Sequence, residues 1–150
     1  MASEARTYAG TLALHDEALI DLLGRLPESM ASWAPWEGAM TTLQLGDHIY
    51  MVDELMVASV LGRDPELKPE PSKSLAELRE NFMVASRRHH EELGRLTPED
   101  FERPISFMGR EMAVRDLLLS LIAHEAHHKG QMFVYARIQG VEPPFYIKMG

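Results

Sequence analysis

The chain of 150 residues contains no cysteine, which excludes disulfides, thiolate metal sites and a cysteine nucleophile. Any thiol chemistry must therefore come from a small-molecule partner. Basic residues are few: 15 Lys and Arg stand against 23 Asp and Glu, a balance that disfavours binding to nucleic acid. No apolar run approaches the roughly 18 residues of a membrane span, and the polar N-terminus is unlike a signal peptide. We expect a cytoplasmic protein without membrane or nucleic-acid partners.

The sequence also lacks internal repeats and low-complexity tracts, and its length fits a single domain over residues 1–150. Apolar residues recur with the 3.6-residue period of amphipathic helices in four stretches. These stretches cover residues 8–26, 42–61, 75–93 and 114–139. The expected fold class is therefore all-α, a four-helix bundle.

Local signals mark where these helices begin and end. Capping boxes at Thr41 and Ser74 favour the starts of the second and third helices. Gly62 and Gly140 are suited to the residues that follow the second and fourth helices. The connection between the third and fourth helices is long, and its stretch RPISFMGREMAV alternates around Met108–Gly109. That alternation predicts a short hairpin.

The stretch HEAHH at residues 124–128 matches H-E-x-x-H, the zinc signature of many metalloproteases. His124 and His128 lie one turn apart on the apolar face of the last helix, so both imidazoles can reach one metal ion. No histidine follows His128 to serve as the third protease ligand, and a bundle offers no edge strand to bind a peptide. Glu125 is rotated by about 100° from His124. We expect it at the pocket edge or paired with a Lys or Arg, and not as a general base.

A third ligand must come from another helix. At about 1.5 Å per residue, His48 lies level with the pair on the last helix and on the inner face of the second helix. His89 is close in height if the third helix runs antiparallel to the second, and His15 is about a turn deeper. We expect His15 and His89 to be hydrogen-bonded core or pocket residues. His90 and His127 are expected to be solvated.

Three blocks of the sequence resemble the DinB/YfiT-like superfamily of metal-dependent enzymes. They are TTLQLGDHIYMVDELM with its inward His48, LLLSLIAHEAHHKGQMFVYARIQG, and the closing GVEPP. The resemblance implies a four-helix bundle whose second and third helices are joined by a short linker. It implies a divalent metal ion held by His48, His124 and His128, and a homodimer. Better understood members are thiol-dependent transferases or isomerases that use bacillithiol, mycothiol or glutathione.

The sequence thus predicts a metal-dependent small-molecule enzyme, with a thiol S-transferase acting on electrophiles as the leading hypothesis. Three imidazoles leave an open coordination position; Zn²⁺ is the expected ion, and Ni²⁺ or Fe²⁺ also suits the ligands. Hydrolysis by a metal-activated water is one alternative. A non-catalytic, metal-binding stress-response module is another, with His89 or His15 as a fourth ligand. Gln131, one turn beyond His128, is expected either to hydrogen-bond near the metal or to pack. No catalytic residue is assigned beyond the metal ligands.

Overall fold

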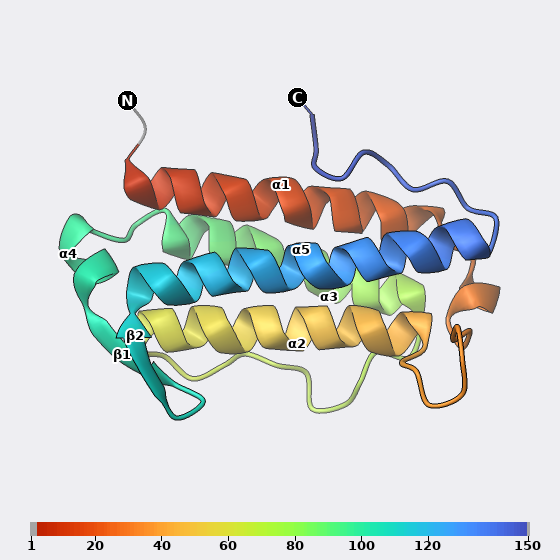
Figure 1. The fold of residues 1–150 in the computed structure, drawn as a ribbon, viewed down its shortest axis with the longest axis horizontal. Coiled ribbons are helices and arrows are strands. Elements are labelled where there is room, and N and C mark those ends of the chain that lie inside the picture. The colour runs from red at the N-terminus through yellow and green to blue at the C-terminus, as the bar shows by residue number, and fades with distance from the viewer. Residues whose placement is uncertain (1–2, 150) are drawn as a thin grey trace.

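The computed structural model describes residues 3–149 and confirms the all-α four-helix bundle (Figure 1). The bundle helices are α1 (Glu4–Arg25), α2 (Thr42–Leu61), α3 (Leu75–Leu93) and α5 (Val114–Ile138). The connections contain η1 (Glu28–Met30), α4 (Pro98–Glu102), β1 (Pro104–Phe107) and β2 (Arg110–Ala113). No helix in the part of the chain that is described is long and apolar enough to cross a membrane.

The helix ends follow the local signals of the sequence. The Thr41 hydroxyl accepts a hydrogen bond from the Gln44 backbone N–H, and the Gln44 side chain accepts one from Thr41 in return. Gly62 ends α2 in the left-handed region, at φ 67°, which a residue without Cβ adopts at little cost. The Ser74 hydroxyl caps α3, but the Glu77 carboxylate accepts from Lys73 instead of Ser74, so this capping box is only half formed.

The predicted hairpin is confirmed. Strands β1 and β2 pair antiparallel from Pro104 opposite Ala113 to Phe107 opposite Arg110. Both central residues of the turn, Met108 and Gly109, have positive φ, which matches the twist of a two-residue hairpin. The hairpin lies at one end of the bundle and leads directly into α5.

The bundle has an unusual direction pattern. Helices α2 and α3 run the same way, and α1 and α5 run opposite to them (Figure 1). The linker over residues 62–74 makes this arrangement possible because it returns along the length of α2: the Glu66 N–H donates to Glu54, and Ser72 donates to Asp47. An antiparallel third helix would have set His89 near the level of His48. In the parallel arrangement, His89 lies instead beside Glu54, further along α2.

Two apolar clusters form the core, one toward each end of the bundle. A layer of buried polar side chains lies between them, and each bundle helix contributes to it. The members of this layer are Asp16 on α1, Asp53 and Glu54 on α2, His89 on α3, and Glu125 and Lys129 on α5. The core is therefore divided into two apolar halves by a polar middle layer.

Candidate metal centre

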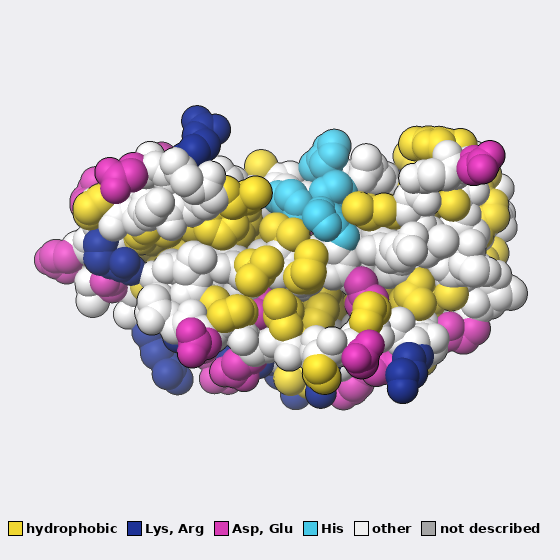
Figure 2. Space-filling view, turned by 90° about the horizontal axis from the view of Figure 1, so that it is seen from below, with side chains coloured by type: hydrophobic (Ala, Val, Ile, Leu, Met, Phe, Trp, Pro, Cys, Tyr) yellow, Lys and Arg dark blue, Asp and Glu magenta, His cyan; other side chains and the backbone are white. Residues whose placement is uncertain are grey.

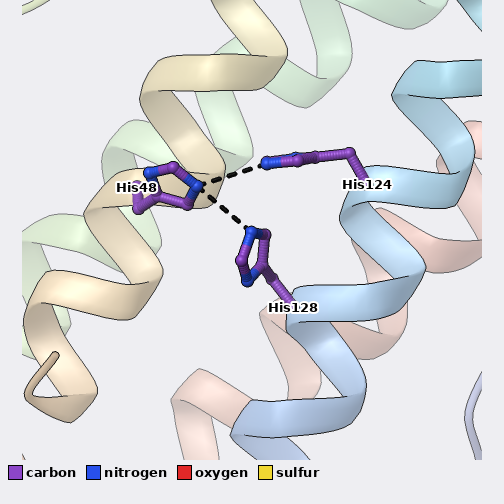
Figure 3. Close-up of side chains that lie close together, drawn as sticks. All are labelled: His48, His124 and His128. Atoms are coloured by element: carbon purple, nitrogen blue, oxygen red, sulfur yellow. Dashed lines mark hydrogen bonds between the residues drawn. The ribbon is translucent and has the colours of Figure 1, made fainter. Parts of the chain in front are cut away.

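Three histidines converge between α2 and α5, which pack against each other (Figure 3). His48 comes from α2, and His124 and His128 lie one turn apart on α5. The Nε2 atom of His48 is 3.2 Å from the Nε2 atoms of both His124 and His128. All three side chains are partly buried, so they are packed against the helices and can still be reached from solvent.

The spacing of these nitrogens fits a single metal ion. Two nitrogens that each lie about 2.0–2.1 Å from a tetrahedral ion are about 3.3 Å apart. The 3.2 Å separations match this value on both sides of His48. One ordinary hydrogen bond cannot explain both contacts, because Nε2 of His48 either donates its single proton or accepts through its single lone pair. The arrangement is that of three lone pairs directed at a common point.

Gln131 determines which nitrogen of His128 carries the proton. Its Oε1 atom lies 2.7 Å from Nδ1 of His128, and an amide oxygen can only accept. The proton is therefore on Nδ1, which leaves the Nε2 lone pair free to face His48. This is the usual way in which a neighbouring side chain orients a metal-binding imidazole. Of the two roles expected for Gln131, the structure shows the hydrogen bond to a predicted ligand.

Burial and the neighbouring rings lower the pKa values of His48 and His124. Removal from water, and then the neighbouring rings of His128, His48 and His127, lower the pKa of His124 to about 4. Burial, followed by the neighbouring His128, also lowers the pKa of His48. Neutral imidazole is the form that binds metal ions, so His48 and His124 are in their binding form at neutral pH.

A pocket of about 420 Å³ opens beside His48, between α2 and the linker over residues 62–74. Its lining is mainly apolar and includes Met40, Met51, Leu67, Pro69 and Pro71. Histidine side chains reach the surface on this side of the molecule and are bordered by hydrophobic side chains (Figure 2). The histidine group therefore adjoins a cavity of a size suited to a small organic molecule.

The other histidines do not join the group. His89 is buried and hydrogen-bonded to Glu54 at 2.6 Å, and Nδ1 of His15 lies 2.6 Å from Nζ of Lys129. His90 and His127 are exposed, as expected. Within residues 3–149, no fourth histidine or carboxylate is grouped with His48 and its two partners.

The expected location of Glu125, at the pocket edge or paired with a Lys or Arg, is wrong. Its side chain is fully buried and neither lines the pocket nor forms an ion pair. Both of its oxygens lack a hydrogen-bond donor among the described residues, and it lies beside Asp16 and Asp53. The reason is that position 125 falls four residues after Leu121, on the stripe of α5 that faces the core.

This group of buried acids was missed in the sequence, although a signal was present. Asp16 follows Leu12 by four residues, and Asp53 follows Ile49 by four. Each acid therefore occupies a position on the apolar face of its helix, where a charged side chain is rarely found. Only the packing of three helices around one point shows that these acids meet.

Comparison with known proteins places the chain in a family. The sequence model of the DinB superfamily matches residues 11–132, more than half of the chain. The chain belongs to the DinB superfamily. This DinB-superfamily chain is 31% identical to the Bacillus subtilis protein YjoA over 140 residues, which cover 88% of the chain and 89% of YjoA. The family resemblance carried by His48 and the HEAHH stretch is thus confirmed.

Solved structures show the same fold. The crystal structure of YjoA superposes on the DinB-superfamily chain with a TM-score of 0.80 at 25% identity, covering 96% of this chain and 99% of YjoA. A DinB-like protein from Bacillus cereus gives 0.81 at 23% identity, covering 91% and 93%. YfiT from Bacillus subtilis gives 0.73 at 16% identity, covering 95% and 92%. YfiT is described as a probable metal-dependent hydrolase with an unusual four-helix bundle topology.

Proposed function

We propose that this chain is a metal-dependent enzyme that transfers a low-molecular-weight thiol to a small electrophile. The observation that carries the proposal is the convergence of three Nε2 atoms beside an apolar pocket, with no fourth protein ligand grouped with them in residues 3–149. His48, His124 and His128 would hold one divalent ion. Zn²⁺ suits three neutral imidazoles best, and Ni²⁺ or Fe²⁺ also suits them.

The residues around the group favour chemistry with a small, apolar partner. An ion held by three imidazoles supplies an open position and lowers the pKa of a thiol or water that enters it. Met40, Met51 and Leu67 offer apolar contact to the electrophile beside His48. The chain has no cysteine, so the attacking sulfur must belong to a cosubstrate such as bacillithiol, mycothiol or glutathione.

Hydrolysis is the second candidate, because the related structure of YfiT is described as a probable metal-dependent hydrolase. The two reactions share the same three histidines and the same pocket. Glu125 cannot serve as the base that H-E-x-x-H supplies in metalloproteases, because its carboxyl is sealed inside the core. Thiol transfer is favoured because a thiol loses its proton readily and does not need Glu125 as a base. Water is harder to deprotonate, and the buried Glu125 cannot assist it.

Metal content tests the ligand assignment. We expect one transition-metal ion per chain in the native protein, and its loss in His48→Ala and in His128→Ala. The matched control is His127→Ala, which removes an exposed histidine from the same helix and should keep the ion. Stoichiometric metal retained by both ligand variants would show that the site is elsewhere.

Activity needs its own measurement. The metal-loaded protein is incubated with a panel of low-molecular-weight thiols and 1-chloro-2,4-dinitrobenzene. In transfer, a carbon–sulfur bond forms, the carbon–chlorine bond breaks, chloride leaves and the thiol proton passes to solvent. We expect metal-dependent conjugation that His48→Ala abolishes. Formation of dinitrophenol at the same rate with and without thiol would support hydrolysis, and no metal-dependent product would reject the proposal for this electrophile class.

A further inference from the structure

Three buried carboxylates meet in the middle layer of the bundle. Asp16 comes from α1, Asp53 from α2 and Glu125 from α5, and their exposed fractions are 2%, 2% and 0%. One oxygen from each side chain lies within 4.8 Å of the others. The group is separate from the three histidines, which are partly buried between α2 and α5.

These carboxylates have too few hydrogen-bond donors for their burial. The Ser86 hydroxyl donates to Oδ2 of Asp16 at 2.5 Å. No N–H or hydroxyl group among residues 3–149 donates to Oδ1 of Asp16, Oδ1 of Asp53 or either oxygen of Glu125. Buried polar atoms almost always have a partner, and an unpaired buried charge costs several kcal/mol. Four unpartnered oxygens around one point indicate a ligand that accepts their lone pairs.

The geometry fits an oxygen-coordinated cation. Oxygens bound to Ca²⁺ or Mg²⁺ lie about 2.0–2.6 Å from the ion, so neighbouring ligand oxygens are roughly 3–5 Å apart. The separation of up to 4.8 Å among the three carboxylates is within this span. Helix bundles hold carboxylate-bound metal ions in this way, with acids projecting inward from facing helices.

The charges of the layer point to a divalent ion. The three carboxylates carry three negative charges when ionised. Lys129, buried one turn beyond Glu125, supplies one positive charge in the same layer. His89 is already engaged with Glu54. A divalent cation would bring the sum over the three acids and Lys129 to zero.

We propose that Asp16, Asp53 and Glu125 bind a second divalent cation, one that prefers oxygen ligands, such as Ca²⁺ or Mn²⁺. This cation joins α1, α2 and α5 at the centre of the bundle and has a structural role. Carboxylates favour hard ions and imidazoles favour Zn²⁺ or Ni²⁺, so the two sites select different metals. The proposal does not depend on the thiol chemistry at the histidines.

The test uses the whole chain, unfolded with chelator and refolded with Zn²⁺ to fill the histidine group. Ca²⁺ or Mn²⁺ is then included during refolding, and bound metal is measured by mass spectrometry after gel filtration. We expect one Ca²⁺ or Mn²⁺ per chain in addition to zinc, together with a higher melting temperature. His48→Ala should lose the zinc and keep the second ion.

Conservative variants assign the ligands. Asp53→Asn and Asp16→Asn keep the side-chain volume and should weaken binding of the second ion at least tenfold. Glu17→Gln, an exposed neighbour on α1, is the matched control and should bind normally. Refolded wild-type protein that binds no second ion, or loss of this ion in His48→Ala, would overturn the proposal. Either result can be read from folded protein even if one Asn variant fails to fold.

Discussion

At the residue scale, the candidate metal centre depends on a side chain that does not belong to the histidine group. Gln131 accepts the Nδ1 proton of His128 and so keeps the opposite nitrogen free. The exposed position of Gln131 means that its replacement leaves the core intact. Its effect on metal binding can therefore be measured without a large change in stability.

We expect Gln131→Leu to weaken zinc binding by about 10–100-fold, because the proton of His128 can then move to Nε2 and the ring can turn. Competition with a chromophoric chelator measures the affinity. His127→Ala is the control and should bind zinc as the wild type does. An unchanged zinc affinity in Gln131→Leu would mean that the hydrogen bond between Gln131 and His128 does not contribute to metal binding.

The sequence predicted the histidine group for a local reason. His124 and His128 are one turn apart on one helix, so their proximity follows from helical geometry alone. His48 was added because it lies at the same height on the inner face of the second helix, and the family resemblance implied the same ligand. The location of Glu125 could not be predicted in the same way, because its neighbours Asp16 and Asp53 lie on two other helices. A residue whose partners are all distant in the chain needs the tertiary arrangement.

At the element scale, α2 and α3 approach closely at Gly46. A Cβ atom at this position would overlap Cδ2 of Leu78, which is fully buried on α3. Gly46 thus lets the two parallel helices pack tightly just before His48. Gly46 faces α3, whereas His48, two residues and about 200° further round α2, faces α5.

We expect Gly46→Ala to destabilise the protein by about 1–2 kcal/mol, since overpacking outweighs the gain in helix propensity. Gly10→Ala on α1 is the matched control: its Cβ meets nothing within 4 Å, and it should stabilise by about 0.5–1 kcal/mol. Urea unfolding measures both. Equal effects of the two substitutions would contradict the close approach.

Glu54 links α2, the linker and α3. It is fully buried and accepts hydrogen bonds from His89, Arg63, Arg88 and the Glu66 backbone. Burial raises the pKa of Glu54, but the hydrogen bonds, led by that from His89, outweigh it and hold the pKa well below the ordinary value of 4.5. This carboxylate therefore stabilises the fold at neutral pH.

Because the folded pKa of Glu54 is depressed, its contribution is complete above the unfolded value of 4.5 and is lost as the pH falls below it. We expect Glu54→Gln to cost about 3 kcal/mol at neutral pH, and clearly less at about pH 3. Unfolding curves at the two pH values measure the difference. Glu66→Gln, in an exposed pair with Arg88, is the control and should cost under about 1 kcal/mol. A loss of stability in Glu54→Gln that does not change with pH would contradict the depressed pKa of Glu54.

Helix bounds could be predicted better than helix directions. The cap of Thr41 and the stop at Gly62 involve only neighbouring residues, so the sequence shows them directly. The direction of α3 depends on whether residues 62–74 turn back at once or run along α2. That choice is made by contacts such as Ser72 with Asp47, which join distant parts of the chain.

At the scale of the whole molecule, metal binding and folding are linked. The proposed ligands come from α2 and α5, so the histidine site exists only in the folded chain. An ion at 100 times its dissociation constant then adds about 2.7 kcal/mol. For a chain of this size we expect a rise in melting temperature of roughly 5–10 °C.

Differential scanning calorimetry of the metal-free protein with and without Zn²⁺ measures this rise. His128→Ala should melt at the same temperature in both conditions. A similar rise in that variant would mean that zinc binds to another part of the molecule. The proposed carboxylate site should not contribute to the rise caused by Zn²⁺, because three carboxylates prefer ions that favour oxygen ligands.

The linker over residues 62–74 has a consequence for how this scaffold diversifies. It makes one wall of the pocket through Leu67, Pro69 and Pro71, while the opposite wall, on α2, carries His48. The linker residues of that wall can change without altering the helices that hold the histidines. Selection for a new substrate can therefore act on one segment while the reactive centre is inherited unchanged, and exchanging this segment between homologues should transfer substrate preference between them.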